Sequence, residues 1–119
     1  MGKIAFVFSG QGAQYPGMGH DLYENSPAAQ KIFTLVEEMR PGTMEQCFNG
    51  TKEILSITEN TQPCLYAVDL AAAVALAEKG VTPEGAAGFS LGEVAAAAFC
   101  GLFGYEDGFA FVCQRAGLM

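Results

Sequence analysis

Two short apolar segments lie far apart in the sequence, and helical patterns fill the interval between them. The first segment is KIAFVF, residues 3–8, and the second lies within PEGAAGFS, residues 83–90. Strands separated by helices run parallel, because a parallel connection needs a long crossover, and the helices then cover the sheet. A continuous apolar run such as KIAFVF is typical of a strand covered on both faces. The sequence therefore predicts an α/β fold with a parallel sheet.

The segments between and after the strands carry start and stop signals of helices. Residues 26–40 predict an amphipathic helix that is capped by Ser26 and has Pro27 directly behind the cap. Its apolar face is expected to contain Ala28, Ile32, Leu35, Val36 and Met39. Shorter helices are predicted at 42–50, ended by Gly50, at 91–100 and at 107–119.

The longest predicted helix covers residues 61–80. Thr61 is its expected cap, Pro63 falls in its first turn, and Gly80 is its expected terminator. Because the segment is apolar almost all round, we expect this helix to be buried. Asp69 interrupts the apolar run.

Composition excludes several classes of protein. The chain has 119 residues, which suits one modest domain, and half of them are apolar, which excludes intrinsic disorder. A net charge of −7 with scattered Lys and Arg argues against nucleic-acid binding. No apolar run reaches the roughly 18 residues of a membrane span, and the N-terminus does not resemble a signal peptide. We therefore expect a soluble, cytoplasmic protein that binds neither nucleic acid nor membrane.

The four cysteines occur singly, without a C-x-x-C pair: Cys47, Cys64, Cys100 and Cys113. A disulfide framework or a zinc site would need tighter clusters and histidine partners. We expect reduced, mostly buried thiols, and neither a metal nor another cofactor.

Two strands do not make a stable parallel sheet, because further strands are needed to bury its faces. The last predicted helix also reaches the end of the sequence without a terminating signal. The chain could simply have a ragged C-terminus. We favour the alternative that residues 1–119 are the first part of a larger α/β domain.

The stretch GFSLG, residues 88–92, fits the pattern G-x-S-x-G between a predicted strand and a predicted helix. In such a nucleophile elbow the strained turn exposes the serine hydroxyl, and the flanking positions leave no room for side chains. Ser90 is therefore a candidate nucleophile, with the main-chain N–H of Leu91 as one oxyanion donor. Glu93 suits the first turn of the following helix. A glycine-rich turn capped by Ser90 without catalysis is the structural alternative.

A second oxyanion donor must come from a loop at the same edge of the sheet. The loop SGQGAQ, which follows the first strand, has that placement. The loop does not fit a phosphate-binding P-loop, because Met18 and Gly19 stand where a P-loop needs Lys and Ser or Thr. The dinucleotide pattern fails as well, because Tyr15 replaces its third glycine.

With these motifs assembled, the chain resembles the N-terminal part of the malonyl-CoA:acyl carrier protein transacylases. The resemblance runs from FVFSGQGAQYPGMG through DLYENSP, TENTQPCLYAVDLA and GFSLGE to QRAGLM. It implies an α/β-hydrolase-like acyltransferase core, present here as an incomplete N-terminal portion. The ferredoxin-like subdomain and the C-terminal part of that catalytic domain would be absent from residues 1–119.

The resemblance also implies roles for individual residues. Ser90 would carry the malonyl group as an ester, and the N–H groups of Gln11 and Leu91 would form the oxyanion hole. Gln62 would line the site. Arg115 would pair with the free carboxylate of the malonyl group, a role that suits a planar, bidentate guanidinium. The implied partners are malonyl-CoA, acyl carrier protein and the missing C-terminal portion of the enzyme.

The sequence departs from the pattern of these enzymes at two points. Phe89 stands where they usually have a histidine, which bears on the choice of acyl group. Their catalytic base is a downstream histidine, whereas the only histidine here is His20, which we expect to be a solvated residue at the start of a helix. Because a serine without its base reacts about 10²- to 10⁴-fold more slowly, this chain alone should be nearly inactive.

Two other functions stay open at the level of sequence. A serine esterase of the α/β-hydrolase class would need an HGGG-type oxyanion loop, which is missing. A non-catalytic interaction fragment would make the glycine-rich segments merely structural. The leading interpretation is malonyl transfer in fatty acid biosynthesis.

Overall fold

The computed structural model describes residues 4–118, so Lys3 of the predicted first strand lies outside the described residues. In chain order the elements are β1 (Ala5–Phe8), α1 (His20–Asn25), α2 (Pro27–Met39), α3 (Thr43–Asn49), α4 (Lys52–Leu55), α5 (Thr58–Glu78), β2 (Gly85–Gly88), α6 (Leu91–Phe99) and α7 (Tyr105–Leu118). The short helix α4, which begins after the Thr51 cap, was not predicted from the sequence.

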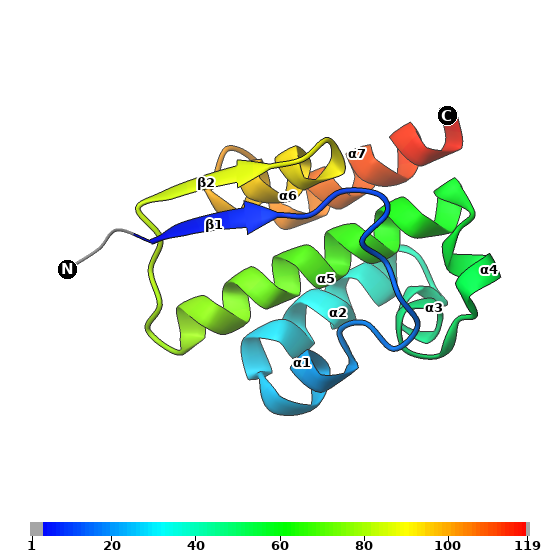
Figure 1. The fold of residues 1–119 in the computed structure, drawn as a ribbon, viewed down its shortest axis with the longest axis horizontal. Helices are drawn as coiled ribbons and strands as arrows, with labels where there is room; N and C mark the ends of the chain where they lie inside the picture. Colours follow the sequence, from blue (N-terminus) through cyan, green and yellow to red (C-terminus); the bar gives the residue numbers. More distant parts are fainter. Residues whose placement is uncertain (1–3, 119) are drawn as a thin grey trace.

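The two strands lie side by side and run parallel, as predicted (Figure 1). Ala5 is opposite Gly85, and Phe8 is opposite Gly88. Since both strands end at the same edge, the loop after β1 and the turn after β2 meet there. This edge is where the candidate site lies.

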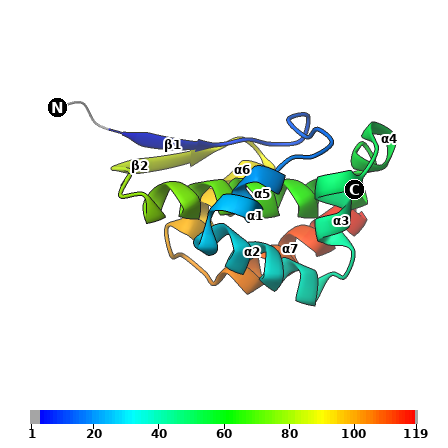
Figure 2. The same ribbon diagram turned by 90° about the horizontal axis from the view of Figure 1, so that it is seen from below.

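The helices cover one face of the sheet (Figure 2). Helix α6 packs against both strands, α5 packs against α6, and α2 and α7 pack against α5. The buried side chains of Phe6 and Phe8 point toward α6, where their rings lie 5.5 and 6.0 Å from that of Phe99.

The opposite face of β1 is open. Ala5 and Val7 are exposed, and Val7 keeps 79% of its surface in solvent. Burial along β1 therefore alternates, and the prediction of a strand covered on both faces is wrong for the described residues. A continuous apolar run does not reveal whether elements outside the run are present to cover its second face.

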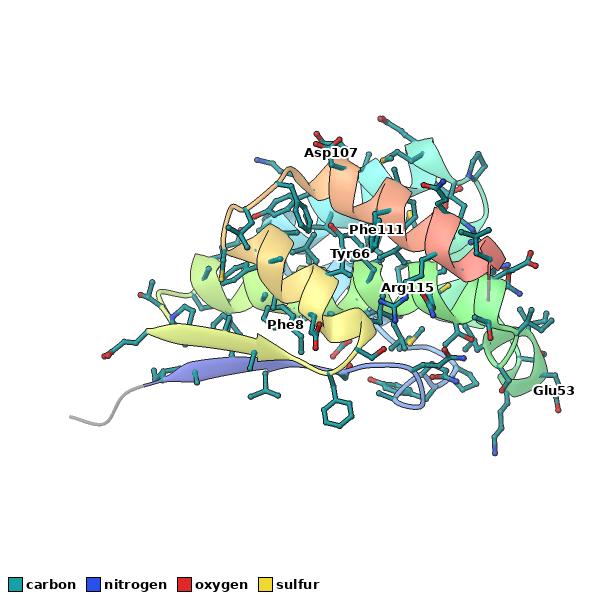
Figure 3. The ribbon with its side chains drawn as sticks, turned by 90° about the horizontal axis from the view of Figure 1, so that it is seen from above. Phe8, Glu53, Tyr66, Asp107, Phe111 and Arg115 are labelled. Atoms are coloured by element: carbon teal, nitrogen blue, oxygen red, sulfur yellow. The ribbon has the colours of Figure 1, made fainter. Side chains whose placement is uncertain are left out.

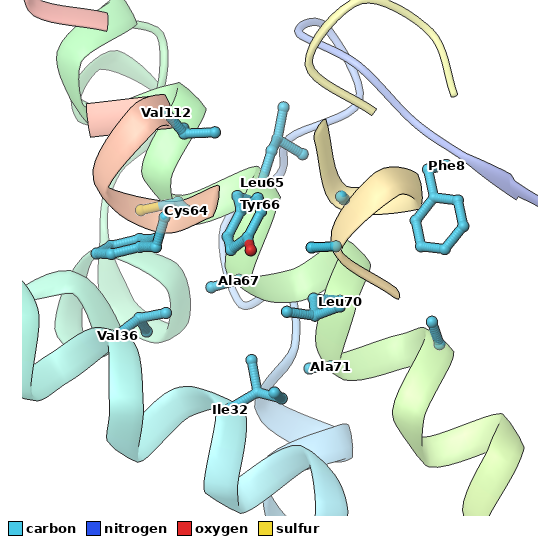
Figure 4. Packing of buried hydrophobic residues seen from close by; sticks show 14 of the residues in the cluster. Phe8, Ile32, Val36, Cys64, Leu65, Tyr66, Ala67, Leu70, Ala71 and Val112 are labelled. Carbon is cyan, nitrogen blue, oxygen red and sulfur yellow. The ribbon is translucent and has the colours of Figure 1, made fainter. Parts of the chain in front are cut away.

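Helix α5 forms the centre of the core and is buried along most of its length, as predicted. Figure 4 shows Tyr66 and Leu70 of α5 between side chains of the neighbouring helices, including Ile32 and Val36 of α2 and Val112 of α7. Residues from α2 and α7 thus pack on the same long helix, which fixes the position of α7 relative to the strands.

The helix predicted at 26–40 is α2, and its cap is confirmed, since the Ala29 N–H donates to the Ser26 hydroxyl at 3.1 Å. Its buried face is turned relative to the prediction, because Phe33 is fully buried whereas Met39 is 42% exposed. The buried residues are Ala29, Ile32, Phe33 and Val36. This stripe follows the i, i+3, i+4, i+7 spacing, and the large ring of Phe33 decides which of two overlapping stripes faces α5.

Helix α5 begins at Thr58, one turn before the predicted cap, so Thr61 lies inside the helix. The Thr61 hydroxyl donates to the Ile57 carbonyl at 2.9 Å instead of capping. Pro63 has no N–H for the carbonyl of Glu59, but Arg40 Nη2 donates to that carbonyl at 3.3 Å. The contact with Arg40 therefore allows α5 to begin before Pro63 by a full turn, although the sequence rules place a proline in the first turn of a helix.

The remaining helix ends agree with the sequence within two residues. Gly80 has a φ of 87° directly after the last residues of α5, which is the conformation of a terminating glycine. Helix α3 ends before Gly50, and α7 begins at Tyr105, two residues before the predicted start. Within residues 4–118, none of the helices combines the length and apolar character needed to cross a bilayer.

Candidate active site

The turn at Ser90 has the backbone of a nucleophile elbow. Ser90 has φ 56° and ψ −108°, and it is the one non-glycine residue with positive φ in the described part of the chain. Such a conformation costs roughly 1–3 kcal/mol and persists only where the surroundings enforce it. The residue itself is exposed, so its hydroxyl is accessible from solvent.

Close backbone contacts enforce this conformation and explain the flanking glycines. A Cβ atom at Gly88 would overlap with the backbone of Gly92, and one at Gly92 would overlap with the carbonyl of Phe8 at the end of β1. Both glycines of the G-x-S-x-G pattern are therefore required by space, as the sequence suggested.

The loop after β1 passes directly over this turn. A Cβ atom at Gly10 would overlap with the carbonyl of Phe89, so the backbone of the loop touches the residue that precedes Ser90. The predicted convergence of the two turns is thus present as a backbone contact. The loop itself has no helix or strand between Phe8 and His20, in agreement with its glycine content.

Two main-chain donors at this edge have no acceptor in the described part of the chain. In α6, the N–H groups of Gly92 and Glu93 donate to the carbonyls of Phe89 and Ser90 at 3.0 and 2.9 Å. The N–H of Leu91 makes no hydrogen bond to any residue between 4 and 118, and the same holds for the N–H of Gln11. Both predicted oxyanion donors are therefore unoccupied main-chain groups.

Arg115 reaches Ser90 from α7. Figure 3 labels Arg115 on this helix. Its Nη2 donates to Ser90 Oγ at 3.0 Å, across 25 residues of sequence. Helix α7 is held in place by Tyr66 of α5, whose hydroxyl donates to the Tyr105 carbonyl at 2.8 Å. Gly108 lies against that hydroxyl, so α7 approaches α5 closely at this point. The guanidinium thereby stands beside the candidate nucleophile.

Gln11 of the first loop and Gln62 of α5 are neighbours. Gln62 is 1% exposed, and its Nε2 donates to Gln11 Oε1 at 3.5 Å. The Nε2 of Gln11 in turn donates to Thr58 Oγ1 at 3.3 Å. All five predicted site residues thus lie on elements that meet at the carboxyl edge of the sheet: Gln11, Gln62, Ser90, Leu91 and Arg115.

The side chains of His20 and Phe89 make no contact with the five site residues that any described hydrogen bond or ring contact records. His20 pairs with Glu24 on its own helix at 3.1 Å and meets the ring of Phe48 edge-on. Phe89 is 79% exposed, although it precedes the candidate nucleophile. The expectation that His20 is an exposed residue at the start of a helix agrees with the structure.

Ser9 and Asp69 are polar residues of the site that sequence reasoning did not use. The Ser9 hydroxyl donates to Asp69 Oδ1 at 2.7 Å, between the end of β1 and the middle of α5. Burial raises the pKa of Asp69 to about 6, and the Ser9 hydrogen bond opposes part of this rise. The sequence signal that could have identified Asp69 is its position as the one acidic residue within the apolar run of the predicted helix.

The cysteines are free thiols, as predicted. Cys47 and Cys64 are buried, Cys113 is partly buried and Cys100 is exposed. A hydrogen bond with Cys64, together with burial, raises the pKa of Cys47, so this thiol stays protonated. Within residues 4–118 no three His, Cys, Asp or Glu residues are grouped as metal ligands.

Comparison with known proteins shows the family to which the chain belongs. Residues 5–119 match the acyl transferase domain family. The chain belongs to this family. Over its whole length it is 39% identical to the malonyl CoA-acyl carrier protein transacylase of Bacillus subtilis strain 168, and over 98% of its length it is 40% identical to that of Synechocystis. It covers 38% and 40% of these two relatives, so it spans about two fifths of their length.

Solved structures of acyl transferases share the fold. The malonyl CoA-acyl carrier protein transacylase of Clostridium perfringens superimposes with a TM-score of 0.92 at 36% identity, over 99% of this chain and 38% of that one. A malonyl-transacylase in complex with a type II polyketide synthase acyl-carrier protein superimposes with a TM-score of 0.90 at 32% identity, over 98% and 38%. The small parallel sheet and its helices are therefore those of an acyl transferase domain.

Proposed function

We propose that the complete protein containing this chain transfers a malonyl group from malonyl-CoA to the phosphopantetheine thiol of acyl carrier protein. The acyl group would be held in between as an ester of Ser90. The reaction would serve fatty acid biosynthesis in the cytoplasm. The closely related transacylases support this assignment, and the contact between Arg115 and Ser90 is the observation that carries it.

The Arg115 contact suits a diacid. In a malonyl thioester one methylene separates the reacting carbonyl from the free carboxylate, so a group that binds the carboxylate must stand close to the nucleophile. Arg115 Nη2 lies 3.0 Å from Ser90 Oγ, and a guanidinium binds a carboxylate through two parallel hydrogen bonds. An esterase acting on simple esters would gain nothing from a cation at this position.

The first half-reaction follows from the same residues. Ser90 Oγ attacks the thioester carbonyl while its proton passes to a base, and the negative charge moves to the carbonyl oxygen. The N–H groups of Leu91 and Gln11, which have no acceptor among residues 4–118, would receive this oxyanion. The tetrahedral intermediate then expels coenzyme A as a thiol, which takes the proton, and leaves the malonyl ester.

In the second half-reaction the carrier thiol attacks the ester carbonyl, and its proton returns through the base to Ser90. We place the base, together with the rest of the coenzyme and carrier surfaces, in parts of the protein outside these 119 residues. His20 is engaged by Glu24 of its own helix α1 and by the ring of Phe48 of α3, and the related transacylases are about two and a half times as long as this chain. The chain alone should therefore acylate slowly or not at all.

Trapping the acyl-enzyme tests the proposal. The complete protein is incubated with radiolabelled malonyl-CoA, quenched in acid, digested and mapped, and we expect the label on the peptide that contains Ser90. Ser90→Ala should remove the label, whereas Ser56→Ala, a serine of an exposed turn, should keep it. A label that persists in Ser90→Ala would contradict the proposal.

A further inference from the structure

The hydrogen bond between Ser9 and Asp69 joins the first glycine-rich loop to the central helix. Ser9 directly follows β1, and its hydroxyl donates to Asp69 Oδ1 at 2.7 Å, across 60 residues of sequence. Asp69 Oδ2 is shielded from solvent and has no hydrogen-bond partner among residues 4–118. A carboxylate in this setting costs free energy relative to an apolar residue, so the contact is not explained by stability alone.

The candidate oxyanion donor, the main-chain N–H of Gln11, lies two residues after Ser9 in the sequence. Gly10 lies against the carbonyl of Phe89, and Gln11, the next residue, has a main-chain N–H without an acceptor among the described residues. The carbonyl of Ser9 also lies close to Gly92 in the first turn of α6. The placement of Ser9 therefore sets how the loop crosses the elbow.

We infer that Ser9 and Asp69 are positioning residues, whose hydrogen bond holds the first loop so that the Gln11 N–H faces the substrate oxygen at Ser90. Neither side chain touches reacting atoms, and each acts through the backbone of the loop. This inference deepens the proposed function and rests on it. Without this hydrogen bond, the nearest side-chain contacts that hold the start of the loop are those of Gln11 with Thr58 and Gln62, while the far end stays bound through the Gly17 N–H, which donates to the Cys47 carbonyl at 3.0 Å.

The same helix offers a matched control for a purely structural role. At the other end of α5, the Ser26 hydroxyl donates to Glu78 Oε1 at 2.9 Å, so a second serine–carboxylate pair ties another segment to α5. This pair anchors the start of α2 and contacts none of the five site residues. If the Ser9–Asp69 pair were only structural, disrupting either pair should have the same effect on catalysis.

The test measures kcat and KM for malonyl-CoA in the complete protein. Ser9→Ala and Asp69→Leu should each lower kcat about 10- to 100-fold with KM changed less than about threefold, because one oxyanion donor is misplaced. The double variant should be no slower than the slower single variant, since both lose one contact. Asp69→Asn, which keeps an oxygen acceptor for Ser9, should restore kcat to within about fivefold. The control Glu78→Leu should leave kcat within about twofold.

A second measurement follows the loop directly. Hydrogen–deuterium exchange of peptides covering residues 9–17 should be faster in Ser9→Ala than in the wild type and unchanged in Glu78→Leu. If Ser9→Ala does not fold, Ser9→Cys, which keeps the volume but weakens the donor, takes its place. Equal kcat values in the Ser9, Asp69 and Glu78 variants would overturn the inference.

The outcomes separate this inference from the proposed function. If the wild type forms the Ser90 malonyl ester but Ser9→Ala forms it at the same rate, the positioning role is wrong and the function stands. If the wild type forms no ester on Ser90, the function is wrong and the positioning role falls with it.

Discussion

The turn after β2 and the loop after β1 meet at one edge of the sheet, but different interactions hold them. The elbow at 88–92 is held by close backbone contacts, since Gly88 and Gly92 lie against each other and Gly92 also lies against the carbonyl of Phe8 at the end of β1. The first loop, residues 9–19, is anchored by side chains of α5, through Ser9 to Asp69 and through Gln11 to Thr58. The elbow is thus fixed by contacts between backbones, which require glycine, and the start of the first loop by contacts between side chains.

This difference explains why the elbow is recognisable from five residues, whereas the anchors of the loop are not. The partners of Ser9 and Gln11 lie 60 and 47 residues away in the sequence. It also predicts that the two turns respond differently to substitution, as the following experiments test.

The largest effect is expected from Gly92→Ala in the elbow. The new Cβ atom would overlap with the carbonyl of Phe8, so the free energy of unfolding should fall by about 3 kcal/mol or more. Gly12→Ala in the loop is the comparison, because Gly12 has φ 114° but open space around its Cβ position, and the loss should be about 1 kcal/mol. Denaturant unfolding measures both, and equal losses would contradict the comparison.

Arg115 of α7 donates a hydrogen bond to Ser90 at the elbow and is the proposed binding group for the malonyl carboxylate. Arg115→Ala should lower kcat/KM for malonyl-CoA about 100-fold, because two charge-assisted hydrogen bonds to the carboxylate are lost. The rate with acetyl-CoA, which has no carboxylate, should change less than about threefold. Arg115→Lys keeps the charge without the bidentate geometry and should give an intermediate rate. An equal loss of kcat/KM with malonyl-CoA and acetyl-CoA would show that Arg115 does not bind the carboxylate.

Asp69 makes the stability of the fold sensitive to pH. Burial raises its pKa from 3.8 to about 6 in the folded protein, so the folded state binds this proton more tightly than the unfolded state. The resulting stabilisation is complete below pH 4 and is lost as the pH rises through 6. Between pH 4 and 7.5 the loss should be about 2 kcal/mol, less than the full shift implies because the carboxylate is only partly buried.

Asp69→Asn removes this titration and keeps the shape of the side chain. The difference in unfolding free energy between variant and wild type should therefore change by about 2 kcal/mol between pH 4 and 7.5. Unfolding profiles that run parallel at all pH values would contradict the assignment of this titration to Asp69.

The smallest effect is expected at Phe89. Its side chain is 79% exposed, so Phe89→His should change the free energy of unfolding by no more than about 0.5 kcal/mol. Thermal unfolding of the two proteins measures this, and a shift of several degrees would show that Phe89 packs against a part of the protein outside this chain.

Much of the fold could be predicted because its signals are local. The strand at KIAFVF, the Ser26 cap of α2, the Gly80 end of α5 and the elbow at Ser90 each depend on a few neighbouring residues. The start of α5 could not be predicted in this way, because Arg40, which directly follows α2, donates to the carbonyl that Pro63 leaves free. The buried face of α2 was misplaced for a similar reason, since contact with α5 selects between two overlapping apolar stripes.

For this protein the sequence by itself determined the parallel strands, the sharp turn at Ser90 and the residue types that chemistry requires there. Glycine and capping residues act on the backbone of their neighbours in the sequence, so short motifs are enough to predict the turns and helix ends that they form. Only the tertiary structure decided that Arg115 stands next to Ser90, and that Ser9 and Gln11 are tied to α5. Those contacts depend on how α5, α6 and α7 pack. Residues that meet through such packing are far apart in the sequence, so no short sequence motif reveals that they are neighbours.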